Sequence, residues 1–216
     1  MKQSTLFVVT LVGLLLAFLA GRSSFSASQN ERAAASADAT MALLVRPHSP
    51  TLGPTNAPVV IVEFFDPACE TCAAFSPMVK QLVAANSDKI RLVLRYAPFH
   101  DGSETVVAAL EASRRQGKFW PTLDAFFGSQ AGWAPNHTSQ VALAWPYLDG
   151  IGLDFDQMRK DMTDPEIVRL IAQDLDDARA LNVTKTPEFF VNGKPLPSFG
   201  FAQLQALVDE ALRQVR

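Results

Sequence analysis

The clearest pattern in the chain is an apolar run at residues 59–65, which reads Val-Val-Ile-Val-Glu-Phe-Phe. Every position except Glu63 carries a β-branched or aromatic side chain, which is typical of a strand covered by helices on both faces. A helix is expected from Cys69 to about Asn86, because its apolar residues recur every three or four positions. A second strand is predicted at 90–96. Strand, helix and strand in this order imply a parallel pair.

The centre of the chain is predicted to be a block of helices. Amphipathic patterns cover residues 104–116, 120–129, 140–148, 154–162 and 165–181. Asp154 and Asp164 precede two of these runs and suit helix N-caps, and Pro165 suits a first helical position. We therefore expect a helical insertion at about residues 103–181.

The C-terminal part returns to strands and ends in a helix. Strands are predicted at residues 43–46, 188–191 and 194–197, and a final helix at 201–215. Asn192-Gly193 is typical of a two-residue hairpin turn, which joins antiparallel strands. The whole pattern therefore predicts an α/β fold in which a mixed sheet is flanked by helices.

Residues 1–27 have the pattern of a secretory signal peptide. Lys2 provides a positive start, the run 6–20 is apolar, and small residues follow it. The run is shorter than the roughly 20 residues of a spanning helix, but the cleavage signal is weak, so an uncleaved membrane anchor is the alternative. Either form predicts an exported domain. Residues 28–42 lack periodicity and are expected to be a linker, which leaves 43–216 as the folded domain.

Composition narrows the function. The 216 residues are 48% apolar and carry a formal net charge of −3, so one domain with a sizeable core is expected. No Lys/Arg-rich run occurs, and nucleic-acid binding is not expected. The two cysteines, Cys69 and Cys72, are too few for the disulfide framework of an exported protein. Their role is therefore expected to be chemical.

The cysteine pair has the spacing that disulfide exchange needs. Cys69 falls at the first turn of its helix, where unpaired N–H groups and the helix dipole lower the pKa of a thiol. The thiolate is the species that attacks a disulfide, and Cys72, one turn later and less exposed, is expected to resolve the mixed disulfide. No cofactor is expected, since the Cys69–Cys72 bond itself carries two electrons.

Other uses of the pair stay open at this point. A structural disulfide over so short a loop would stabilise little. A zinc site needs about four ligands, and the three histidines, His48, His100 and His137, are scattered. A Cu(I) site is harder to exclude, because soft thiolates suit that metal. We expect no metal site.

Two acidic residues near the cysteine pair are expected to influence the ionisation of its thiols. Glu63 is the one charge in an apolar strand, so burial should raise its pKa and let it relay the proton of Cys72; the alternative is an edge residue in solvent. Glu70 lies between the cysteines and should disfavour the Cys69 thiolate, or else be fully solvated. Pro77 is expected to kink the helix.

Residues farther along the chain are expected to contribute less to the cysteine site. A cis Thr186–Pro187 bond would aim the Thr186 backbone at the pair, but few X–Pro bonds are cis. His100 is expected at the surface. The core of the helical block is expected to contain Trp120, Phe126, Phe127 and Trp133. The alternative is an exposed aromatic groove for unfolded clients, which would make the chain a chaperone-like binding module.

Three segments resemble the DsbA-like branch of the thioredoxin superfamily. They are Val62–Cys72, which contains Glu-Phe-Phe-Asp-Pro-Ala-Cys-Glu-Thr-Cys, Arg95–His100, and Val183–Gly193, which contains Thr-Pro-Glu-Phe-Phe-Val-Asn-Gly. The resemblance covers about residues 43–216. It implies a thioredoxin-like fold interrupted by a helical domain.

The resemblance also implies roles for single residues. Cys69 would be the nucleophile and Cys72 the resolving thiol, Glu63 the buried acid beneath them, and Pro187 a cis proline that touches the site beside Thr186. Client proteins with cysteines would be the substrates, and a membrane redox partner would reset the disulfide. The expected location is the periplasm.

Two departures leave the direction of electron flow open. Glu70-Thr71 is not the Pro-His dipeptide of the strongly oxidising members, and Thr186 resembles the isomerase- and reductase-type relatives. No dimerisation domain is expected before the fold, so we expect a monomer.

Overall fold

The computed structural model describes residues 29 and 35–215. Contacts divide the chain into two compact units, residues 1–42 and 43–216. In the first unit, residues 35–42 are helical, and Thr40 donates its hydroxyl to Ser36 O. The predicted signal peptide or anchor at 1–27 lies outside the described residues.

No helix in the described part of the chain combines the length and the apolar character that crossing a membrane requires.

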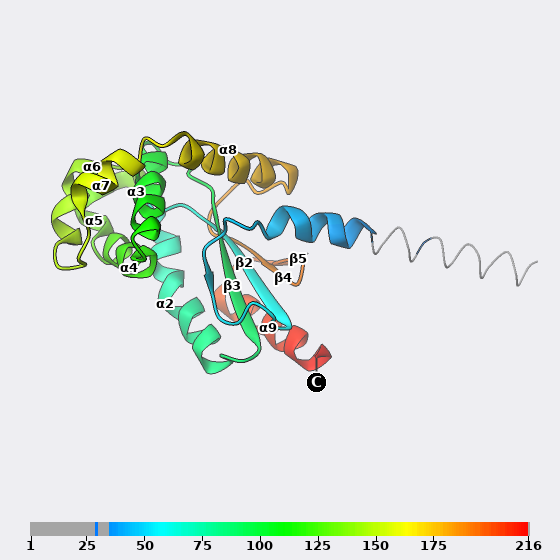
Figure 1. Cartoon of the computed structure of the whole chain (residues 1–216). Coiled ribbons are helices and arrows are strands. Elements are labelled where there is room, and N and C mark those ends of the chain that lie inside the picture. Colours follow the sequence, from blue (N-terminus) through cyan, green and yellow to red (C-terminus); the bar gives the residue numbers. More distant parts are fainter. Residues whose placement is uncertain (1–28, 30–34, 216) are drawn as a thin grey trace, which may run out of the picture. The chain divides into compact units, whose positions relative to one another are not determined.

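The second unit is built on a five-stranded mixed sheet in the order β1-β3-β2-β4-β5 (Figure 1). Its strands are β1 (Thr51–Leu52), β2 (Val59–Phe65), β3 (Ile90–Tyr96), β4 (Glu188–Val191) and β5 (Lys194–Pro195). β2 and β3 are parallel, and the other three pairings are antiparallel. The predicted strands 59–65, 90–96 and 188–191 are confirmed, and the apolar β2 lies at the centre of the sheet.

The edge strand predicted at 43–46 is wrong. Residues 35–44 are helical, and the antiparallel edge strand is β1 instead. Ala39, Met41, Ala42, Leu43 and Leu44 are good helix formers, and within residues 43–46 only Val45 is β-branched. Leu44 is fully buried in the domain core, which favours the helical end over an extended one.

The predicted helices are present with small shifts at their ends, and two short helices at residues 130–133 and 135–137 were not predicted. They are α2 (Glu70–Ala85), α3 (Ser103–Arg115), α4 (Phe119–Gly128), α5 (Gln130–Trp133), η1 (Pro135–His137), α6 (Val141–Ala144), η2 (Trp145–Leu148), α7 (Phe155–Asp161), α8 (Pro165–Ala180) and α9 (Phe201–Gln214). Asp154 and Asp164 cap α7 and α8 as expected, and Pro165 opens α8. The helix predicted at 140–148 is divided into α6 and η2, because Pro146 has no N–H to continue the ladder.

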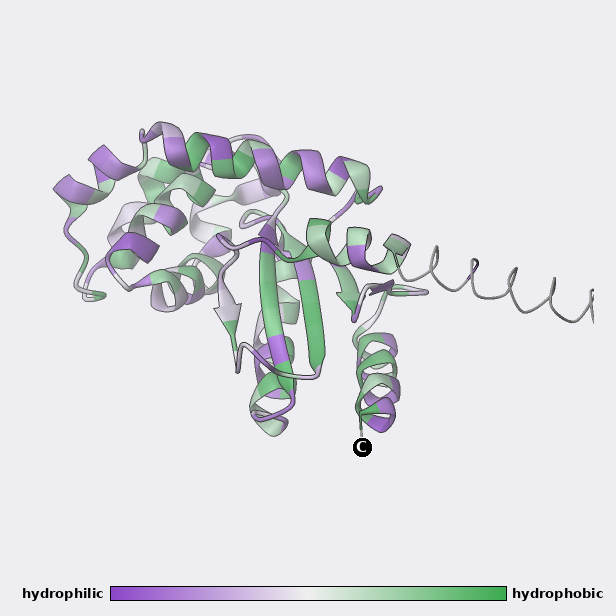
Figure 2. Cartoon of the chain, turned by 45° about the vertical axis from the view of Figure 1, so that its right-hand side comes forward, coloured by the Kyte–Doolittle hydropathy of each residue, from purple (hydrophilic) through white to green (hydrophobic). Residues whose placement is uncertain are grey.

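The sheet separates two layers of helices, with α8 on one side and α2 and α9 on the other. Side chains alternate along β2, so Ile61, Glu63 and Phe65 share one face. That face lies against α2, whose Phe75 stacks on Phe189 of β4 with ring centroids 5.8 Å apart. Figure 2 shows the two long strands of the sheet as mostly hydrophobic, with short hydrophilic bands. Glu63 is therefore placed in an apolar layer directly beneath the cysteine helix.

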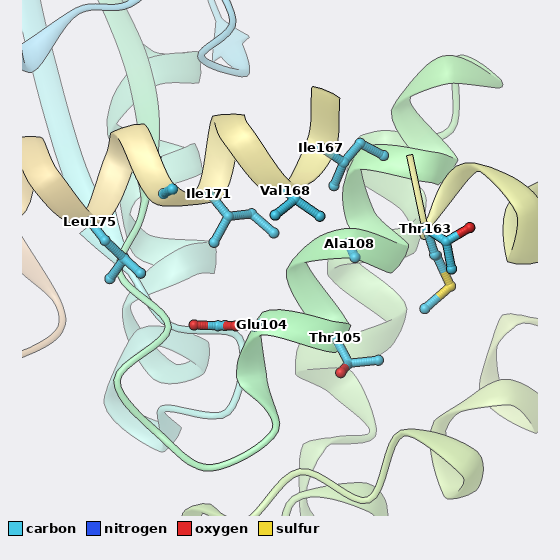
Figure 3. A pocket seen from close by; sticks show the side chains of 10 residues that line it. Glu104, Thr105, Ala108, Thr163, Ile167, Val168, Ile171 and Leu175 are labelled. Carbon is cyan, nitrogen blue, oxygen red and sulfur yellow. The ribbon is translucent and has the colours of Figure 1, made fainter. Parts of the chain in front are cut away.

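An apolar hollow of about 390 Å³ lies between α3 and α8. Figure 3 shows Ile167, Val168 and Ile171 of α8 facing Ala108 and Glu104 of α3 across it. Val168 is 58% exposed at its rim. The hollow contains neither cysteine, so the thiol chemistry does not depend on it.

Candidate active site

Cys69 is the N-cap of α2, and Cys72 lies one turn later. Cys69 has an extended backbone (φ −80°, ψ 116°), and its Sγ accepts the backbone N–H of Cys72 at 3.4 Å. Asp66 and Pro67 end β2 and turn the chain, and the carbonyl of Asp66 accepts the Cys69 N–H at 3.0 Å. A sulfur at this position replaces the oxygen of an ordinary N-cap, so it receives the free N–H groups of the first turn.

The environment of Cys69 favours its thiolate. Hydrogen bonding with the Cys72 side chain is the strongest influence, and it outweighs the opposing effect of burial. The Thr186 side chain and the backbone N–H groups of Cys72 and Thr71 add to it, and together they lower the pKa of Cys69 to about 5. The predicted direction of the shift is therefore found. Cys69 is only 5% exposed.

Cys72 has the opposite character. It is fully buried, and desolvation raises the pKa of its thiol well above the ordinary range. Its hydrogen bond to Cys69 and the charges of Glu63 and Cys69 act in the same direction. At neutral pH the pair therefore consists of one ionised and one protonated sulfur.

Glu63 lies in the middle of the sheet and not at an edge. It is paired with Leu94 of β3 on one side and Phe189 of β4 on the other, and it is 3% exposed. Desolvation, followed by the charge of Cys69, raises the pKa of Glu63 to about 8, and Lys80 opposes this shift. The carboxyl group is therefore largely protonated at neutral pH. A proton donor is thus buried under α2, and the solvent-exposed edge position considered from the sequence is wrong.

The loop before β4 brings Thr186 to the cysteine pair. The Thr186–Pro187 bond is cis, as the family resemblance implies. The Cys69 thiol lies 3.3 Å from the Thr186 carbonyl oxygen, to which it donates. The antiparallel pairing of β4 with β2 fixes this approach, since Phe64 lies opposite Glu188.

His100 has a partner that the sequence did not reveal. Its Nδ1 lies 2.7 Å from Oδ2 of Asp66, and its ring stacks on His137 with centroids 4.8 Å apart. The side chain is 28% exposed, so the predicted surface position is only half correct. Asp66 is fully buried, although neither periodicity nor composition in the sequence gives it a role. Its position three residues before Cys69 was the available signal.

The other residues singled out in the sequence lie in the cysteine helix or in the core of the helical block. Glu70 is exposed at the start of α2, and Pro77 lies inside the helix as predicted. Phe126 and Trp133 are fully buried, whereas Trp120 and Phe127 are partly buried against the core, so the aromatic residues of the block form core as expected.

Within the described residues, no group of three or more His, Cys, Asp or Glu side chains is arranged to hold a metal ion.

Comparisons with known proteins agree with this geometry. A family model described as thioredoxin matches residues 46–210. A thioredoxin-like oxidoreductase from Silicibacter pomeroyi DSS-3 has 33% identity and a TM-score of 0.68, covering 79% of this chain and 96% of that one. Wolbachia pipientis alpha-DsbA1 has 20% identity and a TM-score of 0.67, covering 82% of this chain and 99% of that one.

A relative from Herminiimonas arsenicoxydans carries the name Na(+)/H(+) antiporter NhaA. It is 32% identical over 221 residues, which cover 99% of this chain and 34% of the antiporter. The chain spans no more than about a third of the length of the curated relatives it matches.

Proposed function

We propose that the chain, which belongs to the thioredoxin family and shares its fold with Wolbachia pipientis alpha-DsbA1, exchanges disulfides with cysteine-containing client proteins through Cys69 and Cys72. The observation that carries this proposal is the opposite ionisation of the two sulfurs. Cys69 has a pKa of about 5, whereas burial keeps Cys72 protonated. This asymmetry makes Cys69 the sulfur that forms and releases the mixed disulfide with a client. Cys72 is the sulfur that exchanges with the client for the bond to Cys69.

The exchange can be written with its electrons balanced. A client thiolate attacks Sγ of Cys69 in the oxidised pair, the Cys69–Cys72 bond breaks, and Cys72 leaves as a thiolate. Glu63, which is protonated at neutral pH and whose charge influences Cys72, supplies the proton that Cys72 then takes up. A second client thiolate attacks the client sulfur of the mixed disulfide and releases the Cys69 thiolate. The client is oxidised to a disulfide, and the pair is reduced to a Cys69 thiolate and a Cys72 thiol.

The acidity of Cys69 favours the oxidising direction. A stabilised thiolate stabilises the reduced pair, and this makes the disulfide a stronger oxidant. A pKa of about 5 lies between the values of about 7 for thioredoxin and about 3.5 for DsbA. We therefore expect a reduction potential between the roughly −270 mV of thioredoxin and the roughly −120 mV of DsbA.

An exported location suits this chemistry, because disulfides persist in oxidising compartments. Lys2 and the apolar run at 6–20 support export. The reduced pair would then be reoxidised by a membrane redox partner.

Equilibration of the purified protein with glutathione buffers tests the function and its direction. The fraction of oxidised Cys69–Cys72 is measured by acid quenching and thiol-specific alkylation, with Cys72→Ala as the control that has no pair. A reduction potential between those of thioredoxin and DsbA supports the proposal that the pair oxidises its clients. A potential at or below that of thioredoxin contradicts the direction, and failure to equilibrate contradicts the function.

A further inference from the structure

The short loop between β2 and Cys69 is held by an unusually complete set of hydrogen bonds to one carboxylate. Oδ1 of Asp66 accepts the backbone N–H of Ala68 at 2.8 Å and the hydroxyl of Ser103 at 2.6 Å. Oδ2 accepts the backbone N–H of His100 at 2.8 Å and the ring of His100 through Nδ1 at 2.7 Å. Four donors therefore satisfy a side chain that has no exposed surface.

A second contact to the same loop comes from the helical insertion. Gln130 of α5 is 5% exposed, and its Nε2 donates to the carbonyl of Pro67 at 2.7 Å. Ser103, the first residue of α3, is fully buried. The insertion thus reaches the loop at two consecutive residues, Asp66 and Pro67, from two different helices.

Asp66 influences both cysteines. Its carbonyl accepts the Cys69 N–H at 3.0 Å, its carboxylate accepts the N–H of Ala68 immediately before the nucleophile, and its backbone acts to lower the pKa of the Cys72 thiol. A displacement of Asp66 would therefore move Cys69 relative to the N–H groups of the first turn of α2, which stabilise its thiolate.

We propose that Asp66 is a positioning residue for the cysteine pair, and that the helical insertion sets its position through Ser103 and Gln130. The inference rests on the proposed function, because it assigns to the insertion the task of keeping Cys69 reactive. A negative charge near a thiolate is unfavourable in itself. The carboxylate therefore acts through its geometry, by offering four acceptor positions that an amide cannot offer.

The central experiment compares two serine-to-alanine variants in α3. Ser103→Ala removes a donor to Asp66, whereas Ser113→Ala removes an equally buried hydroxyl that donates to Leu110 O within the same helix. Both variants lose one buried hydrogen bond, so both should be less stable than the parent by a similar amount. The Cys69 pKa is measured by thiolate absorbance at 240 nm, with alkylation by iodoacetamide at pH 5 as a second readout.

Ser103→Ala should raise the Cys69 pKa by about half to one pH unit, and alkylation at pH 5 should then be about two- to fivefold slower. Ser113→Ala should leave both quantities unchanged. Gln130→Ala should also raise the Cys69 pKa. It tests the positioning role if Ser103→Ala does not fold.

A double-mutant cycle tests whether Ser103 acts through the carboxylate. Asp66→Asn places an amide NH₂ against donors of the loop, so we expect this variant to be destabilised and its Cys69 pKa to change. Adding Ser103→Ala to Asp66→Asn should then produce no further change in that pKa, because the interaction is already lost.

The outcomes separate this inference from the proposed function. A parent protein whose Cys69 is no more acidic than a free thiol overturns the proposed function. A parent protein with an acidic, exchanging Cys69 that keeps the same pKa in Ser103→Ala and Gln130→Ala overturns the positioning role alone. Equal pKa changes in Ser103→Ala and Ser113→Ala would also overturn it, since a general loss of stability would then explain both.

Discussion

The Cys69 sulfur lies 3.3 Å from the carbonyl oxygen of Thr186, although 117 residues separate them in the chain. The contact places the loop before β4 beside the nucleophile. It also places the Thr186 side chain where it lowers the pKa of Cys69. The residue before Pro187 is therefore part of the electrostatic environment of the thiol.

Replacement of the threonine hydroxyl should weaken the nucleophile. Thr186→Val removes a hydrogen bond that favours the thiolate, so the Cys69 pKa should rise by about one pH unit. Absorbance at 240 nm against pH measures the shift. Thr184→Val, an exposed change two residues earlier, is the control. An unchanged titration in Thr186→Val would contradict the assigned role of the side chain.

The two cysteines should give different products when each is removed. Cys69→Ala should lose insulin-reducing activity by at least about a hundredfold, because Cys72 is buried and protonated. Cys72→Ala should instead accumulate a mixed disulfide between Cys69 and a client, visible on a non-reducing gel. A mixed disulfide between Cys72 and a client in the Cys69→Ala variant would instead make Cys72 the nucleophile. Thermal unfolding of both variants provides the folding control.

Glu63 should make the stability of the reduced protein depend on pH. Its pKa is raised from 4.5 to about 8, so the folded state binds more protons than the unfolded state between these values. The folded state is therefore favoured fully below pH 4.5, and this contribution is lost as pH rises through 8. Glu63→Gln removes the ionisation, so we expect it to be more stable than the parent at pH 9, by an amount that shrinks towards pH 5.

Urea unfolding of the reduced proteins at several pH values measures this difference. The exposed Glu104→Gln variant controls for a general change of charge. Glu63→Gln should also slow formation of the mixed disulfide at neutral pH, because Cys72 leaves in that step and then takes up a proton. A stability difference that does not depend on pH would show that Glu63 does not titrate in this range.

The hairpin turn should contribute through a side chain as well as through its backbone. Asn192 has φ 47°, and its side chain accepts the N–H of Val60 at 2.7 Å and donates to Pro58 O at 3.2 Å. Asn192→Gly keeps the left-handed backbone accessible but loses both bonds, and it should cost about 1–2 kcal/mol of the free energy of unfolding. Asn182→Gly, at another left-handed asparagine (φ 57°), should cost less. Equal costs would assign the effect to the backbone.

The sequence alone was sufficient to predict those features that depend on neighbouring residues in the chain. The apolar run of β2 predicted a strand covered on both faces, and residues 59–65 form it. Asn192 and Gly193 both have positive φ, as the predicted turn requires. The spacing of Cys69 and Cys72 predicted a thiol at a helix start, because one turn of helix brings the second residue back to the first.

Neither periodicity nor spacing predicted features that depend on strand order or on the packing of the insertion. Whether Glu63 lay in the centre or at an edge depended on the pairing of β2 with both β3 and β4. The contacts of Thr186 with Cys69 and of His100 with Asp66 join segments that no local pattern connects. Hydrophobic patterns determine which face of an element is buried. Only the tertiary structure decides which distant polar groups that burial brings within hydrogen-bonding distance.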